Sequence, residues 1–544
     1  MILSSIITLA SFAHLGSSLC PPPGPLLSPP SLEPKTSNFT IPETVLNSFT
    51  FRQNTSFAIK ASIGDTIVFE HEHSAPGREV AQSLYDTQIR IASATKLITA
   101  LAIVLSEDTI SLEDPITKWV PGLSTEFYGE VNIASLADHT SGLGRFGYVG
   151  DYAISGVNVS ALGLPKVNNT LPGCDPAPGG RVCSNAEVLA MFNNPTYAPH
   201  SPESGSMYSN IAYILLGKAL EKAHNKTYEA VIQDLILDPV GMSKSTFVPP
   251  TNNQTAILPR FPWDASWFVP AFGNLNAVGG LWSTPNDMLK LLQALQNHDL
   301  LSKAKLRKWM QPTTFLRSLQ QANGIAWEIL RPNDLKLAFP RPLDIYTKAG
   351  GVPGYASYAV LIPEYNIALT INAAGGGDQL YVAAIELLAT VSSYLIPYAD
   401  QLARTQAASK YAGTYSLSGS ASSNTVTLSA NNGPGLEVVN MTINNVPVLS
   451  VLAARAKAPL KNFSVRLYPT DPDSLGTAAE NWRLLPDSIN TTKVFADLGC
   501  ATWNAGDWGR YQGGPLDTVT FGMKDGKAES VELQGWRVKL TRVA

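Results

Sequence analysis

Ser93 and Lys96 stand three residues apart at the start of an apolar stretch, a spacing that supports nucleophilic catalysis. Positions i and i+3 share a helix face, so the hydroxyl and the amine can come within hydrogen-bonding reach. A serine attacks at neutral pH only when a nearby base takes its proton. Burial of Lys96 among apolar residues 97–104 would disfavour its ammonium form and make it such a base. The structural alternative is an N-capping serine.

The tripeptide Tyr208-Ser209-Asn210 opens a second apolar helical pattern. A phenol that faces two ammonium groups favours its phenolate form, and it can then act as a general base for Ser93 and as an acid for a leaving group. Simple packing of the tyrosine at a helix start is the alternative. Both candidates need an electrostatic partner from elsewhere in the chain.

The segment Lys348-Ala349-Gly350-Gly351 follows the strand-like residues 343–347. Gly350 and Gly351 carry no side chain, so a substrate acyl group can lie close to backbone N–H donors. Lys348 supplies a positive charge at the same place. We therefore expect this segment to complete the site that Ser93 begins.

The composition describes a globular protein with a sizeable core and more than one domain. The chain has 544 residues, of which 44% are hydrophobic and 15% charged, with a formal net charge of −4. This charge and the lack of a Lys/Arg cluster argue against nucleic acid as a partner. Ser302-Lys303-Ala304-Lys305 repeats the spacing of Ser93 and Lys96, but further basic residues follow it, which is typical of a solvated helix face.

The first 19 residues are apolar and end in small residues, which predicts a signal peptide and a secreted, extracellular protein. No later uninterrupted run reaches the roughly 18 apolar residues of a membrane span, so no membrane-spanning segment is expected. Sequons for N-glycosylation fit this route. They lie at Asn38, Asn54, Asn158, Asn168, Asn225, Asn253, Asn440, Asn462 and Asn490.

The four cysteines fit an oxidising compartment. Cys174 and Cys183 flank a Pro/Gly-rich loop, and we expect them to form a disulfide, with a metal site as the rival interpretation. Cys20 and Cys500 can form a second bridge, although the sequence leaves that connectivity open. No metal and no cofactor are expected.

Hydrophobic periodicity divides the chain into four parts: a signal peptide (1–19), a proline-rich leader (20–40) that should be extended and mobile, a catalytic domain (41–400) and a β-rich C-terminal domain (405–544). Residues 57–61 with 66–70, and 356–362 with 366–372, predict two β-hairpins. Helical patterns lie between and after them, at 186–192, 209–224, 228–237, 286–296 and 379–395. One sheet assembled from both ends of the catalytic domain is therefore expected.

In the order Ser-x-x-Lys, Tyr-x-Asn and Lys-x-Gly, these motifs resemble those of the serine β-lactamase and penicillin-binding-protein superfamily, in its class C β-lactamase and esterase-like branch. Residues 135–143, 238–242 and 279–288 are similar to further family segments. The resemblance implies an α/β fold of the α+β type. Its parts are an antiparallel sheet flanked by helices, an all-helical subdomain and a β-rich C-terminal domain.

The same resemblance implies roles for individual residues. Ser93 would be the nucleophile, and Lys96 and Tyr208 together the proton-transfer pair, with Lys348 as the electrostatic partner of Tyr208. Asn210 would orient the substrate. The remaining positions are glycines on the strand side: Gly350 allows close approach, and the N–H groups of Ser93 and Gly351 would form an oxyanion hole, worth about 2.7 to 4 kcal/mol per donor. His139 is expected to be structural.

Ala349 departs from the family pattern because true β-lactamases carry a hydroxyl residue between the lysine and the glycine. Loss of that donor argues against substrates that present a carboxylate there. The sequence thus favours a β-lactamase-like serine hydrolase of the esterase or amidase type, acting on a small-molecule or peptide acyl substrate. The alternatives are an acyltransferase of the same fold and a non-catalytic binding or sensor protein. The oligomeric state is not predicted.

Overall fold

Two β-hairpins from opposite ends of the catalytic portion meet in one antiparallel sheet. The structure is a computed structural model. It describes residues 19–33, 35–78, 82–148, 150–153, 158–168, 170–174, 181–251, 257, 266–268, 270–377, 380–419, 421–488 and 502–543. The chain forms two units, one of residues 31–335 and 341–396, and one of residues 1–30, 336–340 and 397–544. Each is described separately below.

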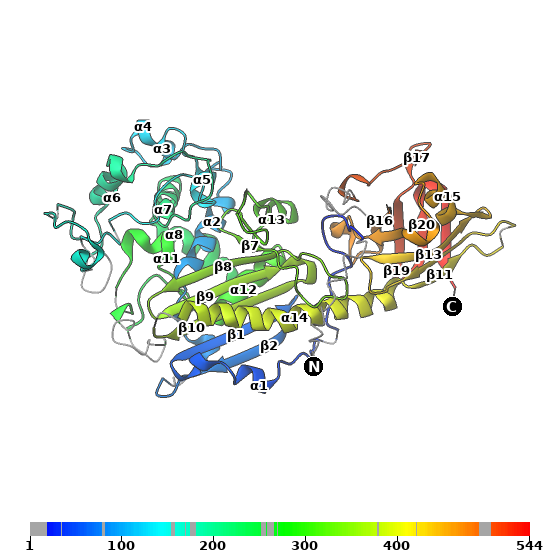
Figure 1. Cartoon of the computed structure of the whole chain (residues 1–544), viewed down its shortest axis with the longest axis horizontal. Coiled ribbons are helices and arrows are strands. Elements are labelled where there is room, and N and C mark those ends of the chain that lie inside the picture. The colour runs from blue at the N-terminus through cyan, green and yellow to red at the C-terminus, as the bar shows by residue number, and fades with distance from the viewer. Residues whose placement is uncertain are drawn as a thin grey trace, which may run out of the picture. The chain divides into compact units, whose positions relative to one another are not determined.

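The first unit is built on an eight-stranded sheet in the order β2-β1-β10-β9-β8-β7-β6-β5 (Figure 1). Both predicted hairpins, β1 with β2 and β9 with β10, are confirmed, and β1 pairs with β10 as expected from a sheet built from both ends. The strands are β1 (Thr55–Ile63), β2 (Thr66–His73), β5 (Thr314–Phe315), β6 (Gln321–Asn323), β7 (Glu328–Leu330), β8 (Ile345–Val352), β9 (Tyr355–Ile362) and β10 (Ile367–Gly375). A separate short pair joins β3 (Ile89–Arg90) to β4 (Trp282–Ser283).

Both faces of this sheet are covered, which explains why β9 and β10 are apolar or small throughout and wholly buried. Successive side chains of a strand point to opposite faces. Ser357 faces the helical layer, where its hydroxyl donates to the carbonyl of Ile91 at 2.7 Å. Tyr358, the next residue, packs its ring against that of Tyr381 in α14 (Leu380–Tyr411) on the other face.

The helical layer surrounds α2 (Thr95–Leu105), an apolar helix in which ten of eleven residues are buried. Apolar side chains on α7 and α11 pack against it, while α12 packs against strands β1, β9 and β10 of the sheet (Figure 1). The helices of this unit before α14 are α1 (Glu43–Leu46), α2, α3 (Ile116–Trp119), α4 (Thr125–Tyr128), α5 (Ile133–Ala137), α6 (Asn185–Phe192), α7 (Ile211–His224), α8 (Tyr228–Ile232), α9 (Asp238–Val240), α11 (Asn276–Gly279), α12 (Pro285–Gln296) and α13 (Lys303–Trp309).

Helix α14 is longer than the sequence pattern predicted. We expected it to end at residue 395 and a β-rich region to begin near residue 405, but the helix continues past Pro397 to Tyr411. Ala403, Ala407 and Tyr411 recur every four residues and are buried, so the last turns have an apolar stripe of their own.

The length and composition of α14 would also suffice for a membrane span, because one 18-residue window has a mean hydropathy of 1.6. A search for an uninterrupted apolar run does not find this window, because a few polar residues end such a run. The same residues lower the mean hydropathy of the window only slightly. Half of the window is buried within the fold. Ala384, Leu387, Val391 and Leu395 are all at most 1% exposed, so α14 packs as a core helix.

The second unit contains an eight-stranded antiparallel β-barrel. Its sheet runs β12-β11-β21-β20-β19-β16-β15-β13, and β12 also pairs with β13, which closes the ring. The strands are β11 (Gly413–Ser416), β12 (Thr425–Ser429), β13 (Leu436–Ile443), β15 (Phe463–Tyr468), β16 (Ala479–Ser488), β19 (Thr518–Lys524), β20 (Lys527–Leu533) and β21 (Val538–Arg542). β14 (Val446–Pro447) extends β13, α15 (Val448–Arg455) follows it, and β17 (Arg510–Tyr511) pairs with β18 (Gly514–Pro515).

We expected the proline-rich leader to be mobile, but part of it is packed against the second unit, to which it belongs. Leu26 and Leu27 are 3% and 6% exposed and pack in clusters of the barrel unit, and Ser28 shares a 2.7 Å hydrogen bond with Tyr411. The prolines fix an extended backbone, but the two leucines supply apolar surface that is buried on folding.

The Cys174–Cys183 disulfide is present as predicted. Cys500 lies outside the described residues, so its pairing with Cys20 stays a prediction. Every asparagine of a sequon within the described residues is exposed, which glycosylation requires: Asn38, Asn54, Asn158, Asn168, Asn225, Asn440 and Asn462. Asn253 and Asn490 lie outside the described residues, as does residue stretch 1–18 of the predicted signal peptide.

Candidate active site

Ser93 lies in a short 3-10 turn, Ala92–Ala94, immediately before α2. Ala92 has a φ of +49°, a conformation that is costly for a residue with a Cβ and often marks a functional turn. The turn is held from the sheet side, because the Ile91 carbonyl accepts from Ser357 and a Cβ on Gly350 would lie 2.0 Å from that same carbonyl oxygen. The glycine in the Lys-x-Gly segment therefore lets β8 approach the Ser93 turn.

Lys96 is fully buried one helical turn below the serine. Its Nζ donates to Ser93 Oγ at 3.1 Å and to the Val278 carbonyl of α11 at 2.7 Å. Burial lowers the pKa of Lys96 to about 8; Lys348 acts in the same direction, while Tyr208 opposes it. About one-tenth of the amine is thus neutral at pH 7, and a neutral amine can accept a proton from Ser93.

Tyr208 lies beside the serine, three residues before the first residue of α7. Its ring centroid is 5.3 Å from the Nζ atoms of both Lys96 and Lys348. Burial raises the pKa of a phenol, but here Lys348, Lys96 and a hydrogen bond with Ser93 outweigh that effect and lower the pKa of Tyr208 to about 8. Tyr208 and Lys96 therefore titrate as an interacting pair around Ser93.

Glu328, in β7, is a site residue that the sequence analysis did not identify. Its Oε1 lies 2.5 Å from Lys348 Nζ, and its Oε2 accepts from the backbone N–H of Ala349 at 2.9 Å. Burial lowers the pKa of a lysine, but Glu328 and Tyr208 outweigh that effect and raise the pKa of Lys348. Lys348 thus remains charged although it is only 1% exposed.

His139, which we expected to be structural, lies directly against the catalytic candidate Tyr208. Its ring centroid is 4.4 Å from that of Tyr208, and its Nδ1 accepts from the backbone N–H of Ser209 at 3.2 Å. Burial, Lys348 and Lys96 lower the pKa of His139 well below its ordinary value, so the ring is neutral. A neutral ring with Nδ1 as acceptor fixes the backbone that carries Tyr208, which makes His139 a positioning residue.

The remaining predicted residues are Asn210, Gly350 and Gly351. Asn210 is half-buried at the first turn of α7, where its N–H donates to the Arg145 carbonyl at 3.0 Å. Gly351 is exposed next to the buried Gly350. Register places Ala349 opposite Tyr358, so its small side chain belongs to the sheet face that α14 covers.

No local motif could have identified Glu328, because the residue acts through strand pairing across 20 positions of sequence. β7 pairs Glu328 with Thr347, which brings its carboxylate beside the next residue, Lys348. His139 had a stronger signal, since it stood in a segment already matched to the family. Its contact with Tyr208 nevertheless depends on a positive φ of 68° that composition does not reveal.

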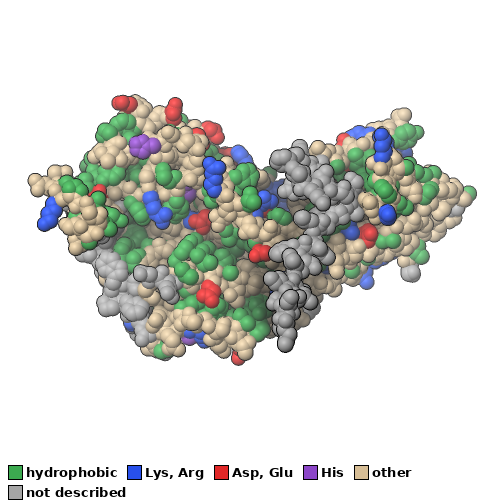
Figure 2. Space-filling view, viewed as in Figure 1, with side chains coloured by type: hydrophobic (Ala, Val, Ile, Leu, Met, Phe, Trp, Pro, Cys, Tyr) green, Lys and Arg blue, Asp and Glu red, His purple; other side chains and the backbone are tan. Residues whose placement is uncertain are grey.

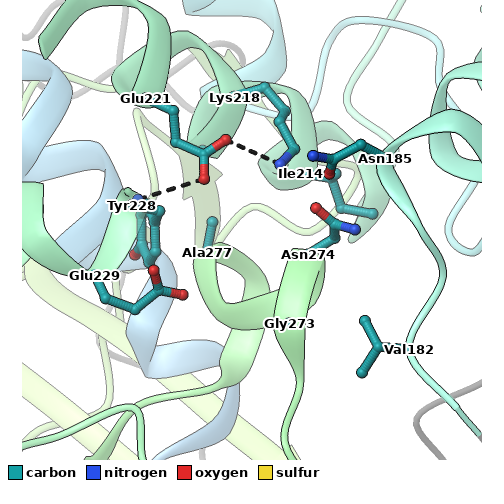
Figure 3. A pocket seen from close by; sticks show the side chains of 11 residues that line it. Val182, Asn185, Ile214, Lys218, Glu221, Tyr228, Glu229, Gly273, Asn274 and Ala277 are labelled. Carbon is teal, nitrogen blue, oxygen red and sulfur yellow. Dashed lines mark hydrogen bonds and ion pairs between the residues drawn. The ribbon is translucent and has the colours of Figure 1, made fainter. Parts of the chain in front are cut away.

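A cavity of about 250 Å³ lies between α7, α8 and α11 and contains none of the predicted site residues. Its wall contains both apolar and polar side chains. Lys218 pairs with Glu221 in α7, while Asn185 at the start of α6 and Asn274 in a 3-10 turn also line the cavity (Figure 3).

Comparison with known proteins places both units. Residues 58–390 match the Beta-lactamase family, and residues 403–544 match a family described as "Beta-lactamase-like-like, C-terminal domain". Among similar proteins, a "Beta-lactamase-like protein" of Arthroderma benhamiae is 27% identical over 80% of this chain and 77% of its own length. A "Probable hydrolase M10" of a Phoma species is 28% identical over 92% of this chain and 87% of its own.

Two bacterial proteins match a smaller share of the chain. The D-alanyl-D-alanine-carboxypeptidase/endopeptidase AmpH of Escherichia coli K12 is 28% identical over 58% of this chain and 77% of its own. The crystal structure of a D-amino acid amidase from Ochrobactrum anthropi, complexed with L-phenylalanine amide, has the same fold, with a TM-score of 0.50 at 21% identity over 66% of this chain and 97% of the amidase. On the family match over most of its length, this chain belongs to the β-lactamase family of serine hydrolases.

Proposed function

We propose that the protein is a secreted hydrolase that cleaves an ester or amide through an acyl-Ser93 intermediate. The observation that carries the proposal is the 3.1 Å contact between the buried amine of Lys96 and Ser93 Oγ, with Tyr208 held between Lys96 and Lys348. Relatives with hydrolase, carboxypeptidase and amidase names support the reaction class.

The proposed first step is acylation. Ser93 Oγ attacks the substrate carbonyl carbon while its proton passes to the Lys96 and Tyr208 pair, and the carbonyl oxygen becomes an oxyanion that accepts from the N–H groups of Ser93 and Gly351. The tetrahedral intermediate collapses when the bond to the alcohol or amine breaks. Tyr208 then donates a proton to that leaving group.

The second step is deacylation by water. The same pair accepts a proton from a water molecule, whose oxygen attacks the acyl carbon, and Ser93 Oγ leaves and recovers its proton. The products are a carboxylic acid and the free enzyme. An alcohol or amine in place of water would give the acyltransferase that the sequence left open.

Secretion is part of the proposal and rests on separate observations. The chain begins with an apolar segment of the signal-peptide type, the Cys174–Cys183 bridge needs an oxidising compartment, and the described sequons are exposed. Expression of the full chain in a eukaryotic secretory host should give a glycosylated protein in the medium. Retention of an unglycosylated chain inside the cells would contradict this part alone.

A fluorophosphonate probe tests the reaction class. Wild type should be labelled at one site, and Ser93→Ala should not be labelled, because phosphonylation needs the activated hydroxyl. Ser302→Ala, which alters the repeat of the same spacing, is the matched control and should label like wild type. Equal labelling of Ser93→Ala and wild type would refute the assignment, and product formation that depends on an added acceptor would favour transfer over hydrolysis.

A further inference from the structure

Arg145 is a cation at the candidate site to which neither the motifs nor the proposed reaction assigns a role. It is exposed, and its guanidinium carbon lies 5.2 Å from the centroid of the Tyr208 ring and 5.4 Å from that of Phe146. Three cations thus surround the one phenol, since Lys96 and Lys348 each lie 5.3 Å from the same centroid.

The backbone around Arg145 is anchored to the start of α7. The Arg145 carbonyl accepts from the N–H of Asn210 at 3.0 Å, and the carbonyl of Gly144 accepts from the Ser209 hydroxyl at 2.8 Å. These two hydrogen bonds connect the loop directly to Ser209 and Asn210, the last two residues of the predicted Tyr-x-Asn motif. The backbone of Arg145 is therefore held next to the segment that carries Tyr208.

The three cations differ in their partners. Lys96 donates to Ser93 and Val278, and Lys348 is paired with Glu328. Within the described part of the chain, the Arg145 guanidinium contacts only the two aromatic rings and reaches no carboxylate. A guanidinium carries five N–H donors in a planar fork that matches a carboxylate, and ring contacts leave those donors available.

We propose that Arg145 binds a carboxylate of the substrate, so that the hydrolase is selective for esters or amides whose acyl chain ends in an acidic group. This inference rests on the proposed function. The exposed arginine lies on the helical side of Tyr208, whereas residue 349, the carboxylate partner in true β-lactamases, lies on β8 and is alanine here. A flexible acidic chain can reach Arg145 without needing a donor at position 349.

The charge distribution supports a local rather than a general attraction for anions. The chain has a formal net charge of −4, and on the face shown in Figure 2 the lysines and arginines are scattered among hydrophobic and uncharged side chains. Selectivity for an acidic substrate must then come from a single cation held beside Tyr208. Of the cations around Tyr208, Arg145 is exposed, while Lys96 and Lys348 are buried.

The test compares two esters that differ only in charge: 4-nitrophenyl hydrogen glutarate, which ends in a carboxylate, and 4-nitrophenyl methyl glutarate, which is neutral. The quantity is the ratio of their kcat/KM values in wild type, Arg145→Met, Arg145→Lys and the control Arg317→Met, which alters an exposed arginine of the same unit. Wild type should prefer the acidic ester, and Arg145→Met should lower the ratio about 10- to 100-fold, as expected for a charge-assisted bidentate contact. Arg145→Lys should recover part of the ratio, and Arg317→Met should keep it.

Two further arms separate the possible failures. Glutarate should inhibit hydrolysis of the neutral ester by wild type and lose potency with Arg145→Met; stronger inhibition by inorganic phosphate than by glutarate would overturn the choice of carboxylate. A ratio unaffected by Arg145→Met would overturn the inference while Ser93-dependent hydrolysis of the neutral ester upholds the proposed function. If Ser93→Ala hydrolyses the neutral ester like wild type, the proposed function itself fails.

Discussion

Because Lys348 lowers the pKa of Tyr208, we expect loss of Lys348 to change how kcat/KM depends on pH. Because the pKa of Tyr208 is lowered from its ordinary 10 to about 8, about one-tenth of the phenol is ionised at pH 7, compared with about one-thousandth for an unperturbed tyrosine. The two ionised fractions differ by about 100-fold. Loss of the lysine should cost part of that factor, which we place at about 10- to 100-fold in kcat/KM at pH 7.

The direction of the shift in the pH profile follows because the deprotonated form of the pair acts as the base. The rising limb of kcat/KM should lie near pH 8 in wild type, where the Lys96 and Tyr208 pair loses a proton. Without Lys348 the phenolate is less favoured, so the limb should move toward pH 10, and the lost activity should return as the pH rises. The loss is thus confined to the lower part of the profile.

The clean perturbation is the double variant Lys348→Met/Glu328→Gln, because Lys348→Met alone would strand the Glu328 carboxylate that it pairs with at 2.5 Å. Glu328→Gln alone is the matched control, and it should shift the limb the other way, since Glu328 raises the pKa of Tyr208 while Lys348 lowers it. The assay is hydrolysis of a neutral 4-nitrophenyl ester from pH 5.5 to 10.5. A double variant that loses activity equally at every pH, or keeps its limb near pH 8, would show that Lys348 does not activate Tyr208 by lowering its pKa.

Three further predictions concern stability, the disulfide and specificity. The pKa of buried His139 lies well below 6.5, so its stabilising contribution is present above about pH 6.5 and is lost as the pH falls below that value. The Tm of wild type should therefore exceed that of His139→Asn by less as the pH is lowered, and a constant difference in Tm would contradict a neutral ring. Removing the Cys174–Cys183 bridge with two serines should cost about 2 to 3 kcal/mol in urea unfolding, because the bridge closes a short loop, and an unchanged midpoint would count against it. With alanine at position 349, a chromogenic cephalosporin should turn over at least about 100-fold more slowly than the preferred ester, a margin typical of a missing polar contact; rapid turnover would show that Ala349 does not limit β-lactam binding.

Much of the fold followed from short-range patterns. The two hairpins and the helices α6, α7 and α12 were predicted within about three residues because period-2 and period-3.6 patterns report which face is buried. The end of α14 was not, because the helix continues past Pro397 on a stripe of buried alanines that the pattern at 379–395 does not include. The docking of Leu26 and Leu27 also depends on a partner surface that is distant in sequence.

The candidate site divides in the same way. Ser93, Lys96, Tyr208 and Lys348 stand in motifs whose spacing already indicates chemistry, and the structure brings them together. Glu328 acts through the pairing of β7 with β8, and Arg145 through backbone contacts with α7, so neither has a local signature. Long-range pairing, rather than residue type, makes both of them part of the site.

The proposed function requires that Ser93 is acylated during turnover. Rapid mixing of excess enzyme with a 4-nitrophenyl ester, acid quenching within milliseconds and mass spectrometry of the digested protein would measure this directly. We expect one acyl group on the peptide that contains Ser93, formed with release of one equivalent of 4-nitrophenolate, and none on Ser93→Ala. Release of 4-nitrophenolate without acylation of Ser93, or acylation of another residue at the same rate, would contradict it.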